Sequence, residues 1–215
     1  MAPRGRPRTF DREQALRSAM DVFWARGYEG ATLEELQTAM GGIAPPSFYA
    51  AFGSKDQLFR EATALYHATL GERMRTAMDA ATARESIEGL LQEGVRCFSD
   101  DDTPRGCLLI LGAINCTRAN KDAYEHLHEL RQQGPDMIRQ RLARGVAEGD
   151  LPAGAPVTEM ASFYTTVMQG LAVRARDGAS PKALMSAALG AMAAWEPMIN
   201  QARPTRRRRS PSRTR

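Results

Sequence analysis

The sequence predicts an all-α protein, and three observations support this fold class. The chain of 215 residues contains 34 Ala and 18 Leu but only six Val and six Ile, so helix formers outnumber strand formers. Apolar residues recur with helical spacing along most of the chain. No segment has the alternating pattern of a strand.

Two short helices and a longer first helix are predicted near the N-terminus. The first has an apolar stripe at Leu16, Ala19, Met20 and Phe23 and should end at Gly27. The second begins at Thr32, which can form a capping box with Glu35. The third begins at Pro45-Pro46, after a tight turn at Gly41-Gly42, and ends near Phe52.

A long fourth helix and five further helices follow. Ser54 should cap the fourth, which continues to about residue 80. The later helices are expected at residues 84–99, 107–119, 121–148, 157–177 and 181–200. Gly134-Pro135 should break or kink the helix over 121–148.

Charge divides the chain into an acidic body and basic ends. Residues 1–12 carry a net charge of +3 and residues 203–215 carry +7, which leaves −6 for residues 13–202 of the overall +4. We expect residues 1–9 to be a flexible arm and residues 203–215 a disordered Arg-rich tail. Basic ends on an acidic body suggest contact with a polyanion such as nucleic acid, although a GC-rich genome also raises the Arg content.

Other composition features exclude whole classes of protein. No apolar run approaches the length of a membrane span, and no hydrophobic stretch follows the Arg-rich N-terminus as in a signal peptide. The three cysteines include no CxxC pair. Phosphate-binding glycine loops, GxSxG, HExxH and paired Cys/His clusters are absent from the sequence. We therefore expect a cytoplasmic protein that is not an enzyme and uses no metal or other cofactor.

The second and third helices have the parts of a helix-turn-helix. Ile43, Phe48 and Phe52 can pack the third helix onto the first two, while Ser47, Tyr49 and Lys55 can contact DNA. The alternative is an ordinary three-helix packing unit, because such trios are common.

The stretch from Phe10 to Tyr66 resembles the DNA-binding domain of the TetR family of bacterial transcriptional regulators. The similarity rests on AMDVFWARGYEGATLEEL, MGGI and SFYAAFGSKDQLF, in that order. A second stretch, from Gly170 to Leu184, resembles the loop between the last two helices of that family. The resemblance implies a helix-turn-helix domain at residues 10–53 and a ligand-binding and dimerisation domain at 54–202, with residues 54–80 as the linking helix.

The resemblance also implies which residues meet DNA. Thr32, Tyr49 and Lys55 would position the protein on the phosphate backbone. The chain departs from the family where Ala44, Pro45 and Pro46 replace the frequent Ser, Lys and Gly. Base reading is therefore expected from Ser47 and from an apolar contact of Pro45 or Pro46 with a thymine methyl group.

The N-terminal arm could add a minor-groove contact. Arg4-Gly5-Arg6 resembles the core of an AT-hook, in which an extended Arg-Gly-Arg enters a narrow groove. A solvated tail is the alternative for this arm and for the run Arg206–Arg209.

The C-terminal half gives weaker signals. By resemblance, the last two helices form a two-fold dimer interface. Leu111, Phe163 and Val167 are the candidates to line a pocket for a small apolar effector, although apolar residues at helical spacing are core by default. His126 and His128 are two apart on a helix, so they make a poor metal pair.

Cys107 is a candidate reactive thiol. It lies at an expected helix N-terminus beside Arg105, where the dipole would favour a thiolate, and RGCLL resembles a signature of a cysteine-sensing branch of the family. The alternative is a buried structural cysteine.

These observations together predict a ligand-responsive repressor that binds a palindromic DNA operator as a homodimer. Two alternatives stay open: a redox- or electrophile-sensing repressor that uses Cys107, and an architectural DNA-binding protein without a ligand.

Overall fold

A computed structural model describes residues 11–201 of the chain, and the basic arm and tail, with Arg4, Arg6 and Arg206–Arg209, lie outside this range. Throughout the described residues the secondary structure is helical. The elements are α1 (Arg12–Gly30), α2 (Leu33–Ala39), α3 (Pro45–Phe52), α4 (Lys55–Ala77), α5 (Ala83–Phe98), α6 (Leu108–Leu111), the 3₁₀ turn η1 (Arg118–Asn120), α7 (Lys121–Glu148), α8 (Val157–Arg176), α9 (Pro181–Met192) and α10 (Trp195–Gln201). No helix in residues 11–201 is both long and apolar enough to cross a membrane.

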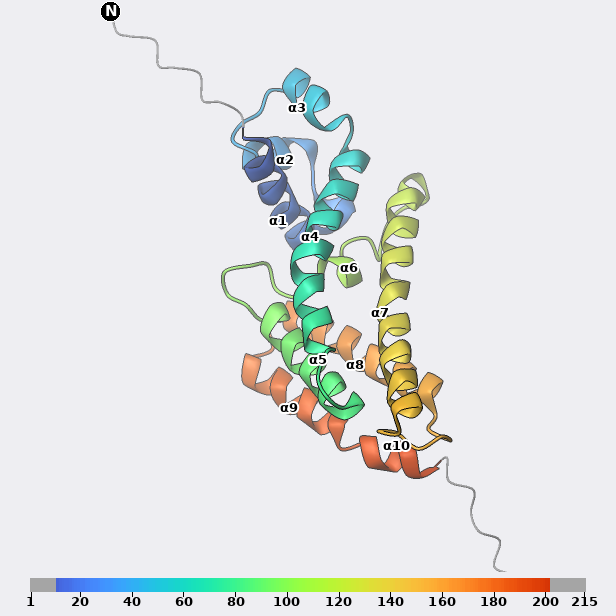
Figure 1. Cartoon of the computed structure of the whole chain (residues 1–215). Coiled ribbons are helices and arrows are strands. Elements are labelled where there is room, and N and C mark those ends of the chain that lie inside the picture. Colours follow the sequence, from blue (N-terminus) through green and yellow to red (C-terminus); the bar gives the residue numbers. More distant parts are fainter. Residues whose placement is uncertain (1–10, 202–215) are drawn as a thin grey trace, which may run out of the picture.

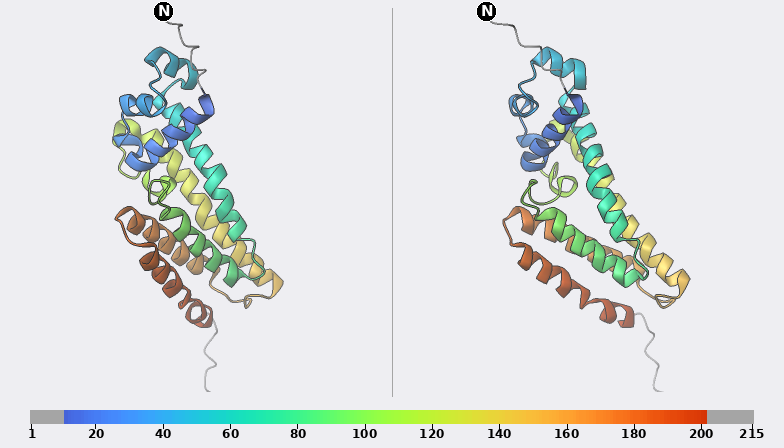
Figure 2. Two further views of the ribbon diagram at one scale, coloured as in Figure 1. Left: turned by 90° about the vertical axis from the view of Figure 1, so that its left-hand side faces the viewer. Right: turned by 60° about the vertical axis from the view of Figure 1, so that its left-hand side comes forward.

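The helices form a small head joined to a larger body by α4 (Figure 1). Helices α1, α2 and α3 surround the N-terminal half of α4 and make up the head. The C-terminal half of α4 continues into the body, where it meets α5, α6 and α7. Helix α9 packs on α5 and α8 and lies along the outer side of the body (Figure 2).

Side-chain caps set the beginnings of the head helices. Asp11 accepts hydrogen bonds from the N–H groups of Glu13 and Gln14 at the start of α1. Thr32 and Glu35 form the predicted capping box, and Ser54 caps α4 as predicted.

The core of the head is aromatic. Phe23, Tyr28 and Phe59 pack with their ring centroids 4.9–6.3 Å apart, which ties α1 to α4. Trp24 packs edge-on against Tyr66 at 4.8 Å and extends this cluster toward the body. The C-terminal end of α1 is therefore closely packed against α4.

Gly27 ends the regular part of α1, as the sequence predicts. Its φ of 72° lies in the left-handed region, and a Cβ there would lie 3.0 Å from the carbonyl oxygen of Gly112. The chain makes one more turn before it leaves the helix at Gly30.

Three of the expected helices differ in the structure. The helix expected at 107–119 shrinks to α6, because Gly112 uses its carbonyl to accept a hydrogen bond from the Tyr28 N–H and the chain turns away. Helix α7 continues through Pro135 without a break, since Leu127 and Leu142 are fully buried on either side and hold both halves on one core. The last helix divides into α9 and α10 at two tight turns, in which Ala193 and Ala194 bond three residues back.

Candidate nucleic-acid interface and ligand pocket

One face of α3 is buried and the other is exposed. Phe48 has no exposed surface and Phe52 is 3% exposed, so these rings anchor α3 to the head. Pro45, Pro46, Ser47 and Tyr49 are exposed on the opposite side, at the end of the molecule far from the body (Figure 1). The four residues predicted to meet DNA from α3 are thus presented together on one surface.

The N-terminus of α3 offers few hydrogen-bond donors. Ala44 provides no side-chain cap, and Pro45 and Pro46 have no N–H group. Ser47 is the first residue of the helix with a backbone donor, and it adds a hydroxyl group. A phosphate or base edge that approaches this helix end would therefore meet Ser47 first.

Thr32 caps the start of α2, and Lys55 is the first residue of α4. Thr32 is exposed, but its hydroxyl oxygen already accepts from the Glu35 N–H and contacts the Glu35 carboxylate. The Lys55 ammonium lies 4.4 Å from the centre of the Tyr28 ring. Burial lowers the pKa of Lys55, while the nearby Glu29 and Asp56 carboxylates oppose that shift. Lys55 therefore sits at the junction of α1 and α4, at the edge of the α3 surface.

Arg12 braces α3 from the opposite side, a role that the sequence analysis missed. Its guanidinium donates to the carbonyl oxygen of Ala51 at 3.2 Å and to the Glu61 carboxylate at 2.7 Å. It also stacks over the Phe52 ring at 4.5 Å. The end of α3 is thereby fixed to α1 and α4, which orients its exposed face.

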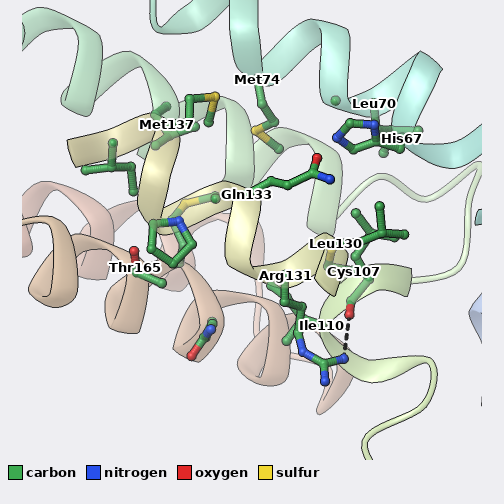
Figure 3. Close-up of a pocket in the computed structure, with 18 of the residues that line it drawn as sticks. His67, Leu70, Met74, Cys107, Ile110, Leu130, Arg131, Gln133, Met137 and Thr165 are labelled. Atoms are coloured by element: carbon green, nitrogen blue, oxygen red, sulfur yellow. Dashed lines mark hydrogen bonds between the residues drawn. The ribbon is translucent and has the colours of Figure 1, made fainter. Parts of the chain in front are cut away.

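The body contains a cavity of about 350 Å³ between α4 and α7 (Figure 3). Helices α5 and α8 close its other sides, and α6 covers the end nearest the head. Its lining is mainly apolar and includes Leu70, Met74, Leu90, Phe98, Leu109, Ile110, Leu130, Met137, Ile138 and Met168. This size and lining are typical of a site for a small organic ligand.

The three lining residues predicted from the sequence are not those of this cavity. On α8 the cavity is lined by Thr165, Met168 and Gln169. Phe163 and Val167 project from the opposite side of that helix and pack against the hydrophobic core, so they do not line this cavity. Leu111 is also absent from the lining, and its side chain lies over Gly106 instead.

Cys107 does line the cavity, and its environment favours the buried neutral cysteine over the candidate thiolate. Burial raises the pKa of the Cys107 thiol, although the neighbouring Tyr66 hydroxyl opposes that shift. Helix α6 has only four residues, and Arg105 donates to the carbonyl oxygen of Ala179. Neither the dipole nor Arg105 overcomes desolvation, so the thiol is neutral at neutral pH.

The described histidines and acidic residues do not assemble a metal site. Among residues 11–201 no group of three or more His, Cys, Asp or Glu side chains could hold a metal ion. His126 is hydrogen-bonded to Thr63 at 2.8 Å, and the His128 ring stacks on Tyr124.

The segment that covers the cavity also holds the end of α1. The Trp24 indole N–H donates to the Gly106 carbonyl at 3.2 Å, and the Tyr28 N–H donates to the Gly112 carbonyl at 2.6 Å. Between these two attachment points, Cys107, Leu109 and Ile110 line the cavity. A ligand that shifts α6 would therefore also disturb the hydrogen bonds that Trp24 and Tyr28 of the head make with Gly106 and Gly112.

Arg176 reinforces this connection from the end of α8. Its guanidinium donates to the carbonyl oxygens of Trp24, Ala25 and Arg105 at 2.6–3.0 Å. Charge-assisted bonds of this kind are stronger than neutral ones. One side chain thus joins α8, the segment before α6 and the end of α1.

Replacing Arg176 by alanine should lower the free energy of unfolding by about 2 kcal/mol, because three carbonyl groups lose a charged donor. Arg118→Ala is the control, since Arg118 is exposed and its side chain makes no ion pair or hydrogen bond with residues 11–201. Urea unfolding of the three proteins measures the difference. A loss below about 0.5 kcal/mol for Arg176→Ala would show that these bonds contribute little.

Glu29 gives the junction a pH dependence. Its carboxylate accepts from the Thr117 N–H at 2.6 Å, and this bond is the main reason that the pKa of Glu29 falls to about 2. Because the folded pKa lies below the ordinary value, the contribution to stability is complete above about pH 4.5 and is lost as the pH falls toward 2.

Glu29→Gln should therefore have a lower melting temperature than the unmodified protein at pH 6, and the gap should narrow as the pH approaches 2.5. Calorimetry across this range measures the gap. A gap that stays constant with pH would contradict a charged Glu29 in the folded protein.

The chain is similar to known proteins over most of its length. Residues 15–62 match the model of bacterial regulatory proteins of the tetR family, and residues 81–192 match the tetracyclin repressor-like C-terminal domain. The HTH-type transcriptional repressor ComR of Escherichia coli (strain K12) is 32% identical over 203 residues, which cover 91% of this chain and 94% of ComR. The repressor BdcR of the same strain is 31% identical over 189 residues, which cover 86% of this chain and 88% of BdcR.

A solved structure is similar in both sequence and fold. It contains a cysteine mutant of the TetR family transcriptional regulator CifR, complexed with a 26-base-pair double-strand operator DNA. The identity is 46% and the TM-score is 0.85, over 88% of this chain and 100% of the CifR chain.

Proposed function

The chain belongs to the TetR family of bacterial DNA-binding transcriptional regulators. We propose that it represses transcription by binding a palindromic operator as a homodimer. A small ligand that enters the cavity between α4 and α7 would release it from the DNA. Residues 10–53 would form the DNA-binding domain and residues 54–202 the ligand-binding and dimerisation domain. Its site of action would be the cytoplasm, where the operator DNA is. One observation carries the proposal: α4 borders both the recognition surface and the cavity.

The exposed face of α3 would enter the major groove. Ser47 has a hydroxyl group and a free helix-start N–H for base or phosphate, and Pro45 and Pro46 can contact thymine methyl groups. Tyr49, which is 51% exposed, would reach the phosphate backbone with its hydroxyl group. Thr32 and Lys55 would flank it as further backbone contacts, and Arg4 and Arg6 would extend into the adjacent minor groove.

A homodimer would place two such surfaces side by side. Val173 on α8 and Leu189 on α9 are 43% and 48% exposed, although both are apolar. Gly170 and Gly190 lie on the same two helices, and no atom lies within 4 Å of a Cβ built at either position. Apolar side chains beside small residues favour close packing of these helices against their copies in a second subunit.

Ligand entry would act on the spacing of the two recognition helices. The cavity touches α4 at His67, Leu70 and Met74 and touches α6 at Leu109 and Ile110. Both elements are attached to the head, α4 through the aromatic core and α6 through Gly106 and Gly112. A ligand that favours one spacing over the other lowers operator affinity by its differential binding to the two states, typically about 1–3 kcal/mol.

Selection of DNA from a random library by the purified full chain tests this function. We expect enrichment of a palindrome with half-sites about one helical turn apart, bound at least roughly a thousandfold more tightly than random DNA. An architectural DNA-binding protein would instead bind all sequences with similar affinity and enrich nothing. The cavity favours the regulator over this alternative. Sensing by a Cys107 thiolate is not proposed, because burial keeps that thiol neutral.

Substitutions on α3 should separate base reading from backbone contact. Ser47→Ala should reduce the free-energy difference between the preferred base and the other bases by about 1–3 kcal/mol at one position of each half-site. Tyr49→Phe should weaken binding to every sequence alike, because a backbone contact carries no sequence information. Binding of both variants to the selected operator and its single-base changes distinguishes the two roles. A uniform loss for Ser47→Ala would contradict its role as a base reader.

A further inference from the structure

The charged groups that line the cavity are unbalanced in sign. Arg75, Arg131 and His67 lie in the lining, and no Asp or Glu does. Arg75 already pairs with Glu72 at 2.7 Å. Burial and the neighbouring Arg75 lower the pKa of His67, so this imidazole is neutral at neutral pH. Arg131 is therefore the side chain that determines the charge of the cavity.

Arg131 has no carboxylate partner among the described residues. Its guanidinium donates to the carbonyl oxygen of Leu109 at 3.1 Å (Figure 3). It also lies 5.6 Å from the centre of the Tyr124 ring. A carbonyl group and a ring stabilise a cation without neutralising it. Arg131 is half-buried, and an arginine side chain stays protonated in proteins. An anion bound in the cavity would therefore neutralise this positive charge.

Thr165 shows a second unmet polar group in the same cavity. It lies on α8 (Figure 3), and its hydroxyl oxygen is buried without a hydrogen-bond partner. A buried hydroxyl group without a partner is unfavourable. Both observations indicate that the occupant carries polar atoms and is not a pure hydrocarbon.

The remaining lining residues indicate the chemical character of the rest of the ligand. Five helices contribute methionine, leucine, isoleucine and phenylalanine side chains, and the methionines Met74, Met137 and Met168 are flexible enough to adapt to different shapes. Such walls favour an aliphatic or aromatic body over a sugar or a nucleotide, whose hydroxyl groups would be left unpaired.

We propose that the cavity binds an amphipathic carboxylate, with its apolar body between α4 and α7 and its carboxylate on Arg131. This inference rests on the proposed function and specifies its ligand class. The planar guanidinium matches a carboxylate in geometry as well as charge. Since Arg131 also holds the Leu109 carbonyl of α6, the head group would bind beside the segment that is attached to α1.

Matched probes of one chain length test the proposal. Decanoate, 1-decanol and decylammonium are titrated by calorimetry into the full-length protein and into Arg131→Gln. The control is Arg139→Gln, because Arg139 is exposed on the same helix and pairs with Asp136 outside the cavity. Binding to the selected operator is measured for all three proteins without any probe.

The unmodified protein should bind decanoate at least tenfold more tightly than 1-decanol and more tightly still than decylammonium. Arg131→Gln should lose this preference but keep its affinity for 1-decanol, which also shows that the cavity remains folded. Arg139→Gln should behave like the unmodified protein. Equal or tighter binding of 1-decanol, no binding of decanoate, or an undiminished preference in Arg131→Gln would overturn the proposal. If the protein still binds its operator in those cases, the ligand class is wrong and the proposed repressor function stands.

Discussion

Gly190→Glu should convert the proposed dimer into a monomer and weaken operator binding roughly a hundredfold or more, because a single subunit contacts only one half-site and loses the avidity of the pair. Gly190 is exposed on α9, and a Cβ there meets nothing within 4 Å. Glutamate also favours a helix more than glycine does, so the substitution should not harm α9 itself. The expected loss therefore comes from a charge buried between two subunits.

Sedimentation and DNA titration of the same preparations measure both effects of Gly190→Glu. The control is Ala147→Glu, which adds the same charge at an exposed position near the end of α7. A Gly190→Glu protein that stays dimeric would show that the interface lies elsewhere. A monomer that still binds the palindrome tightly would separate dimerisation from DNA recognition.

Phe48→Ala should lower the free energy of unfolding by about 3–5 kcal/mol and abolish specific binding to the operator. The Phe48 ring has no exposed surface and packs beside Phe52, so its loss leaves a cavity beneath the recognition helix. Helix α3 has no side-chain cap at its start and only eight residues, which makes it dependent on this anchor.

Tyr49→Ala is the matched control for Phe48→Ala. Tyr49 is the next residue along α3 and is 51% exposed, so its removal should change the stability by less than about 0.5 kcal/mol while it weakens DNA binding. Chemical unfolding and operator titration compare the two variants. Equal losses of stability would contradict the division of α3 into a buried and an exposed face.

The head could be predicted closely from the sequence because its determinants are local. Thr32 and Glu35 are three residues apart and form the capping box that their spacing predicts. Phe48 and Phe52 are four apart, so both fall on the buried face of α3. Gly27 ends the first regular helix for a reason that is partly local, its positive φ, and partly tertiary, its contact with Gly112.

The cavity could not be predicted in the same way. Helical spacing shows that Phe163 and Val167 share an apolar face, but it does not show whether that face meets a core or a cavity. The residues that line the cavity on α4 and α7 are separated by more than 50 positions, as in His67 and Arg131, and only the packing of the helices brings them together. The helix expected at 107–119 failed for a similar reason, since the Gly112 carbonyl bonds to Tyr28 in a distant part of the chain.

Cys107 illustrates the limit for reactivity. The sequence places a cysteine after Arg105 at a helix start, which is a favourable pattern for a thiolate. The pattern does not show whether the cysteine is buried. In the folded chain burial has the largest effect and raises the pKa of the thiol. Arg105 meanwhile serves the Ala179 carbonyl.

The central claim is that cavity occupancy and operator binding are coupled, and a reciprocal titration tests it most directly. The probe is the fluorescent amphipathic anion anilinonaphthalene sulfonate. Gly134 lines the cavity, and a Cβ at this position would meet no other atom within 4 Å. Gly134→Trp should therefore fill part of the cavity, and the fluorescence that it removes identifies the probe bound there. By linkage, a probe that binds the released state more tightly must bind more weakly when operator DNA is bound. We predict that operator duplex weakens binding of the cavity-bound probe at least fivefold, whereas a scrambled duplex leaves it unchanged. Equal probe affinity with and without operator DNA would contradict the coupling.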